Sequence, residues 1–106
     1  MKQLIRLGVL LCIVLTAGIH LYLAIIATLP VFYANAIGFL VLGAAYANIG
    51  IPLPLPRERV VVALQVYTII TVVLWVFVGE RTPIAYIDKI AELLIVGLLW
   101  YEQRID

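Results

Sequence analysis

Four apolar stretches dominate the sequence, and each approaches the length of about 20 residues that a helix needs to cross the hydrocarbon core of a bilayer. We expect helices at about 4–27, 32–49, 60–78 and 84–101. Pro30 follows the first stretch, and the segment 50–56 repeats proline at alternate positions, which favours an extended strap. Thr82 and Pro83 provide an N-cap and a first helical position for the fourth helix. Because short connections favour up-and-down topology, the sequence predicts an all-α bundle of four transmembrane helices in one domain, residues 1–106.

Composition supports a membrane location and excludes several classes of protein. Of the 106 residues, 66% are hydrophobic and 12% are charged, against about 45–50% and 25% in soluble domains. A net charge of +1 provides no basic field for nucleic acid. One cysteine, Cys12, and one histidine, His20, cannot form a disulfide within the chain or a zinc site with three or four ligands. Since a glycine-rich phosphate loop and a Ser-His-Asp constellation are also missing from the sequence, we expect neither an enzyme nor a bound cofactor or metal.

The distribution of charge predicts the orientation of the helices. With four spans, both termini and the second connection share one side of the membrane, which has five Lys and Arg residues: Lys2, Arg6, Arg57, Arg59 and Arg104. The other side has two, Arg81 and Lys89. The positive-inside rule therefore predicts a multi-pass protein of the cell membrane with both termini in the cytoplasm. Aromatic residues near the helix ends, such as Tyr46 and Trp75, are expected at the membrane interfaces.

Five polar residues interrupt the apolar stretches: His20, Asn35, Asp88, Lys89 and Glu92. Asp88 and Glu92 are spaced i, i+4 and share a helix face, and Lys89 can reach Glu92 at i, i+3. At about 1.5 Å per residue, His20 lies as deep as Glu92, and Asn35 matches the depth of Asp88. Because a polar group in the hydrocarbon region is costly without a partner, these residues predict an intramembrane polar cluster. The sequence leaves open whether the cluster moves protons or only fixes the register of the bundle.

Small residues predict where helices approach one another closely. Gly8, Cys12 and Thr16 recur every four residues in the first helix, and Ala34 and Gly38 have the small-xxx-small spacing in the second. Such stripes allow two helix backbones to come close together. The sequence leaves open whether these residues pack inside the bundle or against another protein.

Two segments indicate a resemblance to known proteins. Gly18-Ile19-His20-Leu21-Tyr22-Leu23 lies near the end of the first stretch, and Tyr86-Ile87-Asp88-Lys89-Ile90-Ala91-Glu92-Leu93 opens the fourth. In these motifs, and over nearly its whole length, the chain resembles a group of small prokaryotic four-span membrane proteins without assigned function. In size and number of spans it is also similar to DoxX-like membrane proteins. The resemblance implies a shared intramembrane site around His20, Asp88, Lys89 and Glu92, and it implies no substrate.

Because almost no residue lies outside the apolar stretches, we expect the protein to act on lipid, on neighbouring helices or through the bundle itself. The first hypothesis is a non-enzymatic accessory or scaffold subunit, either in a homo-oligomer or in a larger membrane complex such as a respiratory or photosynthetic one. The second is a proton-coupled transporter or channel-like protein in which Glu92 exchanges the proton. The third is a protein that binds a quinone or another lipid near His20, with Tyr22 and Trp75 as walls of the site.

Overall fold

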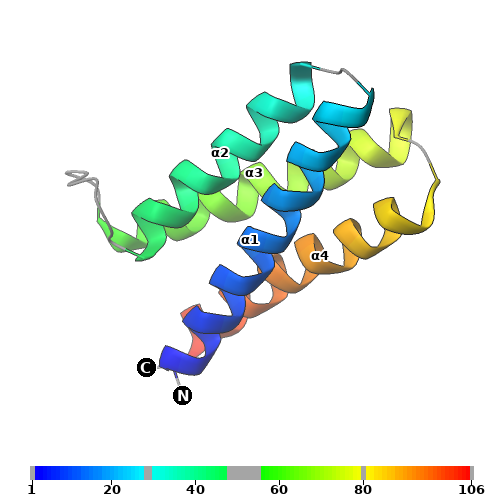
Figure 1. Ribbon diagram of the computed structural model, residues 1–106. Coiled ribbons are helices and arrows are strands. Elements are labelled where there is room, and N and C mark those ends of the chain that lie inside the picture. The colour runs from blue at the N-terminus through cyan, green and yellow to red at the C-terminus, as the bar shows by residue number, and fades with distance from the viewer. Residues whose placement is uncertain (1, 28–29, 48–55, 80, 106) are drawn as a thin grey trace.

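The helices begin and end close to the expected bounds. The structure is a computed structural model that describes residues 2–27, 30–47, 56–79 and 81–105. Its helices are α1 (Lys2–Ala27), α2 (Pro30–Ala47), α3 (Arg57–Val78) and α4 (Pro83–Arg104), as Figure 1 shows. α2 begins two residues earlier than expected because proline in the first turn loses no helical hydrogen bond. The predicted end of the second helix at Ile49 lies outside the described residues, as does the proline-rich segment 50–56 except Pro56.

The four helices run up and down around a common centre, so the all-α, up-and-down prediction is confirmed. α1 packs against α2 and α4, and α3 packs against the same two helices from the opposite side. Figure 1 shows both ends of the chain together at one end of the bundle. We call this the terminal end, and we call the opposite end, where α3 connects to α4, the loop end. The longest dimension is 41 Å, which exceeds the about 30 Å of a hydrocarbon core.

The starts of α3 and α4 follow local signals in the sequence. The side chain of Thr82 accepts a hydrogen bond from the backbone N–H of Ala85 at 3.2 Å, and Pro83 occupies the first turn of α4. The predicted N-cap is therefore confirmed. α3 begins at Arg57, three residues earlier than expected, after Pro56, whose dihedral angles of −59° and 146° are those of a polyproline helix.

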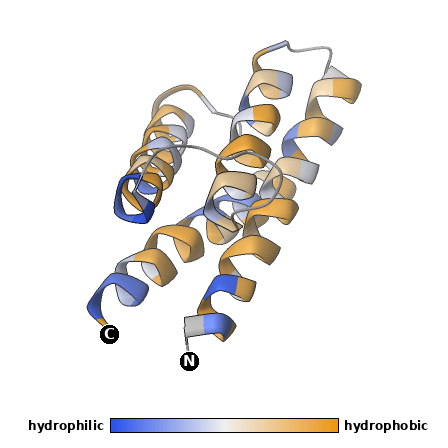
Figure 2. Cartoon of the chain, turned by 90° about the vertical axis from the view of Figure 1, so that its left-hand side faces the viewer, coloured by the Kyte–Doolittle hydropathy of each residue, from blue (hydrophilic) through white to orange (hydrophobic). Residues whose placement is uncertain are grey.

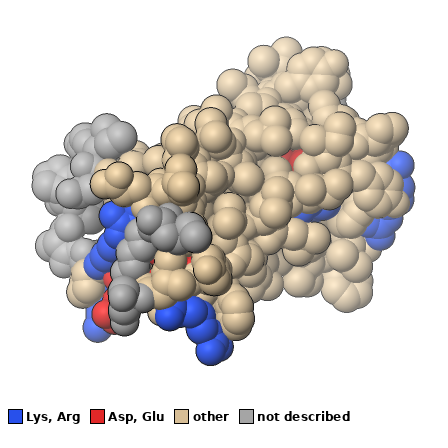
Figure 3. Space-filling model, turned by 90° about the horizontal axis from the view of Figure 1, so that it is seen from below, with Lys and Arg blue, Asp and Glu red and all other residues tan. Residues whose placement is uncertain are grey.

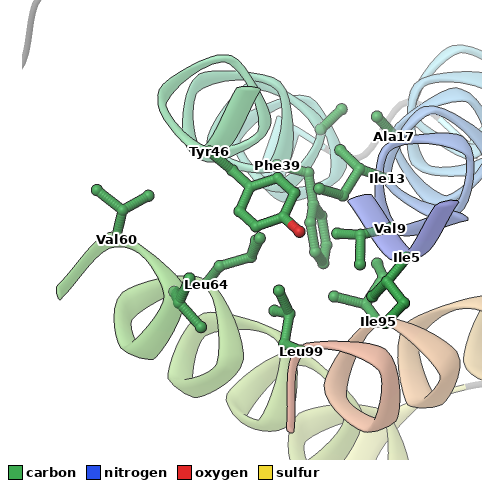
Figure 4. Packing of buried hydrophobic residues seen from close by; sticks show 12 residues of the cluster. Ile5, Val9, Ile13, Ala17, Phe39, Tyr46, Val60, Leu64, Ile95 and Leu99 are labelled. Atoms are coloured by element: carbon green, nitrogen blue, oxygen red, sulfur yellow. The ribbon is translucent and has the colours of Figure 1, made fainter. Parts of the chain in front are cut away.

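The apolar core fills the half of the bundle nearest the terminal end. All four helices contribute to it, and Figure 4 shows side chains from α1, α2, α3 and α4 pointing toward one another. Five of the core residues have no exposed surface: Val9, Phe39, Leu64, Ile95 and Leu99. These residues lie in the half of each helix that is nearer the terminal end. The half of the bundle nearer the loop end contains buried polar side chains.

The outer surface of the bundle is apolar as well. Large hydrophobic side chains are exposed on every helix, including Leu11, Ile37, Ile70 and Leu93. Figure 2 shows hydrophobic residues along all four helices. A soluble monomer rarely exposes so much contiguous apolar surface, whereas lipid-facing helices do so as a rule.

Among the described residues, three helices contain segments long and apolar enough to cross a membrane: Gln3–Ile26, Pro30–Ala47 and Arg57–Val78. These segments indicate a multi-pass membrane protein. The sequence analysis expected a fourth span in α4, but this helix has three charged residues, Asp88, Lys89 and Glu92, within 18 residues of its start. By length and composition alone, α4 is therefore not among the candidate spans.

Candidate functional site

A group of charged and polar side chains lies buried between α1 and α4, on the loop-end side of the apolar core. It consists of Thr16 and His20 from α1 and of Asp88, Lys89 and Glu92 from α4, and we call it the ionic cluster. None of the five residues is more than 6% exposed. The structure thus brings together four residues of the expected polar cluster and adds Thr16, which the sequence analysis assigned to helix packing.

Lys89 lies between the two carboxyl groups of the ionic cluster. Its Nζ is 2.5 Å from Glu92 Oε1 and 3.1 Å from Asp88 Oδ2. The contact with Glu92 follows from the i, i+3 spacing, which places the two side chains on the same side of α4. One positive charge therefore serves two acidic side chains, so the three residues have a net charge of −1 when both acids are ionised.

The hydroxyl group of Thr16 lies between the remaining oxygen atoms of the same two carboxyl groups. It hydrogen bonds to Asp88 Oδ1, and its Oγ1 is 2.9 Å from Glu92 Oε2. A hydroxyl group has one hydrogen, so it donates one full hydrogen bond. Both contacts are hydrogen bonds only when one of the carboxyl groups is protonated and donates to Oγ1. The geometry therefore accommodates one proton on Asp88 or Glu92.

His20 contributes to the ionic cluster from the next turn of α1. Its Nδ1 is 2.8 Å from the backbone carbonyl oxygen of Thr16, and since a carbonyl oxygen only accepts, Nδ1 carries a hydrogen. Nδ1 is also 3.6 Å from Asp88 Oδ1, and Nε2 is 3.8 Å from Glu92 Oε2. Because Nε2 faces a carboxyl oxygen, a small approach of the two side chains is enough to pass a proton between Glu92 and His20.

The surroundings of the ionic cluster make an unbalanced charge costly. The rings of Phe32 and Phe39 lie 5.8 and 6.1 Å from the imidazole of His20, and Phe39 belongs to the apolar core. Burying an unpaired charge costs several kcal/mol even after the protein relaxes. Lys89 and the two acidic residues are neutral together only with one further proton, and that proton has three possible positions: the two carboxyl groups and His20.

Three side chains of the ionic cluster could also contact a metal ion. His20, Asp88 and Glu92 each offer one ligand atom, and these atoms lie within 4.8 Å of one another. Lys89 already places a positive charge at bonding distance from both carboxyl groups. A divalent cation would be repelled by this ammonium group, whereas a proton completes the charge balance without displacing it.

Trp75 and Tyr22, the expected walls of a ligand site, lie in different surroundings. The Trp75 ring packs edge-on against Tyr86 at 5.3 Å, lies 4.1 Å from the guanidinium group of Arg81 and is 5.9 Å from Lys89 Nζ. Trp75 thus covers Lys89 toward the loop end. Tyr22 is exposed and lines an open apolar groove on the outer face of α1, and Trp75 is not among the residues that line this groove.

Asn35 belongs to a separate polar group between α2 and α3. Its Nδ2 donates to Thr71 Oγ1 at 3.2 Å, and its backbone carbonyl oxygen accepts from Tyr67 Oη at 2.8 Å. Tyr67 lies so close to Gly38 that a Cβ atom there would collide with the tyrosine hydroxyl group. Among the described residues, the polar partners of Asn35 are therefore on α3, although its depth matches that of Asp88 on α4.

The other expected packing residues differ in their surroundings. A Cβ atom at Gly8 would lie 3.3 Å from Leu98 Cδ1, so this glycine lies at the close contact of α1 with α4. Cys12 is half-buried and packs against the apolar core. Ala34 is exposed on the outer surface of α2, so it is available to lipid or to another protein.

A third polar group, which the sequence analysis missed, lies at the terminal end and takes one residue from each helix. Arg6, Tyr46 and Arg57 surround the carboxyl group of Glu102, and we call these four residues the terminal network. Tyr46 and Glu102 are buried within the bundle, and the expected position of Tyr46 at a membrane interface stays a prediction. One feature of the sequence indicates that Glu102 points into the bundle. It follows Asp88 by 14 residues, which is two heptads, and therefore lies on the same face of α4 as Asp88.

Comparison of the chain with protein-family models, with curated proteins and with solved structures finds no match. No family is identified, and the resemblance to small four-span prokaryotic proteins stays a prediction from sequence. In the part of the chain that the structure describes, the protein is a small four-helix all-α protein with three helices long and apolar enough to span a membrane.

Proposed function

We propose that this protein is a proton-coupled membrane transporter that binds and releases one proton at the ionic cluster. The observation that carries the proposal is the excess of acidic over basic groups in the ionic cluster. One lysine lies between two carboxyl groups of residues that are at most 2% exposed, so one further proton is needed for neutrality. Ionisable groups inside a membrane bundle commonly form proton relays. The proton has donors and acceptors on two helices, since Thr16 and His20 approach the carboxyl groups from α1.

The proposal includes α4 as a fourth membrane span. Its three central charged residues point into the ionic cluster, whereas its outward side chains Ile87, Ile90, Leu93 and Leu94 are 50–59% exposed. The helix has 22 residues, which at 1.5 Å per residue corresponds to about 33 Å and is enough to cross the hydrocarbon core. An inward polar face and an outward apolar face suit a helix that is surrounded by lipid on one side only.

The proposed orientation has both termini in the cytoplasm. Of the two basic residues assigned to the opposite side, Lys89 is buried in the ionic cluster and does not contribute to a loop. Arg81 alone then remains among the basic residues of the loop end, against five at the terminal end. The positive-inside rule favours the terminal end as the cytoplasmic one.

Within the described residues, a layer of buried apolar side chains separates the ionic cluster from the terminal end. Ile95 and Leu99 follow Glu92 on α4 and have no exposed surface, and Val9 and Leu64 complete the layer from α1 and α3. A proton does not cross such a layer without water or polar side chains. This arrangement favours a carrier that opens to one side at a time over a continuous channel.

The proposal is tested with protein reconstituted into liposomes that enclose a pH-sensitive dye. We expect an imposed proton gradient to change the internal pH faster with the protein than without it, and we expect Glu92→Gln to abolish the difference. The matched control is Glu58→Gln, which removes an exposed carboxyl group at the start of α3. Equal flux in the wild type and in Glu92→Gln would contradict the proposal.

Chemical labelling gives an independent measurement of the bound proton. Carbodiimides react with protonated carboxyl groups, and an apolar carbodiimide partitions into the membrane. We expect modification of Asp88 or Glu92 in the wild type, with Glu58 unmodified, because Glu58 is exposed to water. Mass spectrometry of the labelled chain identifies the residue.

A second candidate function, an accessory subunit of a larger assembly or a homo-oligomer, is favoured by two exposed glycines. A Cβ atom at Gly18 in α1 or at Gly97 in α4 would meet nothing within 4 Å. Such positions allow another helix to approach the backbone closely. Native mass spectrometry after gentle extraction tests this candidate, and a bare monomer would contradict it.

A further inference from the structure

The terminal network has more positive charge and more hydrogen-bond donors than its own residues can satisfy. Arg6 and Arg57 together provide ten N–H donors and two positive charges. Their acceptors among the described residues are Glu102 Oε1 and the backbone carbonyl oxygen of Tyr46. Among the described residues, one carboxylate therefore faces two guanidinium groups, which is an excess of one positive charge.

Arg57 is held in a fixed position by Tyr46. Its Nη1 donates to the carbonyl oxygen of Tyr46 at 2.9 Å, and its Cζ lies 4.6 Å from the centre of the Tyr46 ring. Its Nη2 is 3.4 Å from Glu102 Oε1. Because the guanidinium group is already oriented, binding a further acceptor requires little loss of side-chain freedom.

Arg6 approaches the same carboxylate oxygen from α1, but more loosely. Its Nε is 3.8 Å from Glu102 Oε1, which is an ion pair without a hydrogen bond. The Nε atoms of Arg6 and Arg57 are themselves buried and have no hydrogen-bond partner among the described residues, whereas the two side chains as a whole are 40% and 37% exposed. An oxyanion at this place would approach the exposed parts of the two arginine side chains, whose positive charges are incompletely balanced among the described residues.

We propose that Arg6 and Arg57 bind the phosphate group of an anionic phospholipid at the terminal end of the bundle. A singly charged phosphodiester neutralises the excess charge, and guanidinium groups bind phosphate oxygens in pairs of hydrogen bonds. Figure 3 shows Lys and Arg side chains toward the ends of the molecule, where lipid headgroups lie beside spanning helices. The site is separate from the ionic cluster and does not depend on the proposed proton transport.

Native mass spectrometry in detergent tests the proposal with two lipids of equal chain length, phosphatidylglycerol and phosphatidylcholine. We expect the wild type to retain phosphatidylglycerol in preference, and Arg6→Gln to weaken its binding about tenfold or more, as expected for the loss of a charge-assisted hydrogen bond. Arg57→Lys keeps the positive charge but removes the planar guanidinium group that can donate two parallel hydrogen bonds, so this variant is expected to weaken binding as well. The matched control is Arg59→Gln, which removes the same charge from an exposed arginine of α3 and is expected to bind as the wild type does.

Three results would overturn the proposal. Equal loss of phosphatidylglycerol in Arg6→Gln and Arg59→Gln would mean that only the general charge of this end attracts the lipid. Equal retention of the two lipids by the wild type would mean that headgroup charge is not recognised. Complete displacement of phosphatidylglycerol by inorganic phosphate would assign the site to a free phosphate ion and not to a lipid. Since Arg6 has one long ion pair and is partly exposed, its variant is expected to fold, which circular dichroism verifies.

Discussion

The proton of the ionic cluster predicts how the stability of the protein depends on pH. Under the proposed function, the folded protein holds one proton among Asp88, Glu92 and His20, which lie together in the ionic cluster. All three are unprotonated in the unfolded chain above about pH 7. The unfolded state then binds one proton fewer than the folded state, so stability falls as pH rises. The expected slope is about −1.4 kcal/mol per pH unit for each such proton.

Two substitutions in neighbouring residues change this slope in opposite directions. Lys89→Met removes the positive charge, so both carboxyl groups must be protonated in the folded state and the slope doubles to about −2.7 kcal/mol per pH unit. At pH 7 this variant is also expected to be about 3–5 kcal/mol less stable, because it breaks a buried ion pair. Asp88→Asn leaves Lys89 paired with Glu92 alone, which is neutral without a further proton, and its slope is expected to be close to zero.

The measurement is unfolding by sodium dodecyl sulfate of protein in a mild detergent, followed by circular dichroism at several values between about pH 7 and 8.5. Glu58→Gln serves as the control and should keep the slope of the wild type, since Glu58 is exposed. A wild-type stability that does not change over this range, together with an unchanged slope in Asp88→Asn, would refute the reasoning, because the folded cluster would then hold no extra proton.

Three further predictions concern packing, helix capping and a buried hydrogen bond, and unfolding in detergent measures each of them. Gly38→Ala is expected to destabilise the protein by about 1–3 kcal/mol because the new methyl group meets the hydroxyl of Tyr67, whereas Gly97→Ala, in open space, is expected to be neutral or stabilising by up to about 1 kcal/mol. Thr82→Ala removes the N-cap of α4 and is expected to cost about 1 kcal/mol. Tyr46→Phe leaves a buried carboxyl oxygen of α4 without its donor, at an expected cost of about 1–3 kcal/mol.

The part of the ionic cluster on α4 could be predicted from sequence because its contacts are local. Asp88, Lys89 and Glu92 lie within five residues of one helix, so helical spacing alone brings their charged groups together. Depth estimates also placed His20 beside them, and the structure has the expected contacts between helices. The role of Thr16 could have been inferred as well, because it lies one turn before His20 on the same helix.

Other contacts could not be predicted, because depth in the membrane does not determine the direction in which a side chain points. Asn35 has the depth of Asp88 but faces α3, where Thr71 and Tyr67 bond to it. Which helices become neighbours around the bundle depends on packing along their whole length, and the apolar sequence gives little information about it. The burial of Glu102 likewise depends on arginines from two helices that are distant in the sequence.

The ionic cluster and the terminal network both depend on α4, and this constrains how a proton could move. Glu92 and Glu102 are ten residues apart, which is about 15 Å along the helix axis, and Ile95 and Leu99 between them have no exposed surface. Displacing α4 relative to α1 would separate the carboxyl groups from Thr16, whereas displacing α2 or α3 would leave this bond intact. A carrier that releases its proton by movement therefore needs the α1–α4 contact to change. A crosslink between α1 and α4 at Gly8 and Leu98, after both are changed to cysteine, should stop proton transport without affecting proton binding by the ionic cluster.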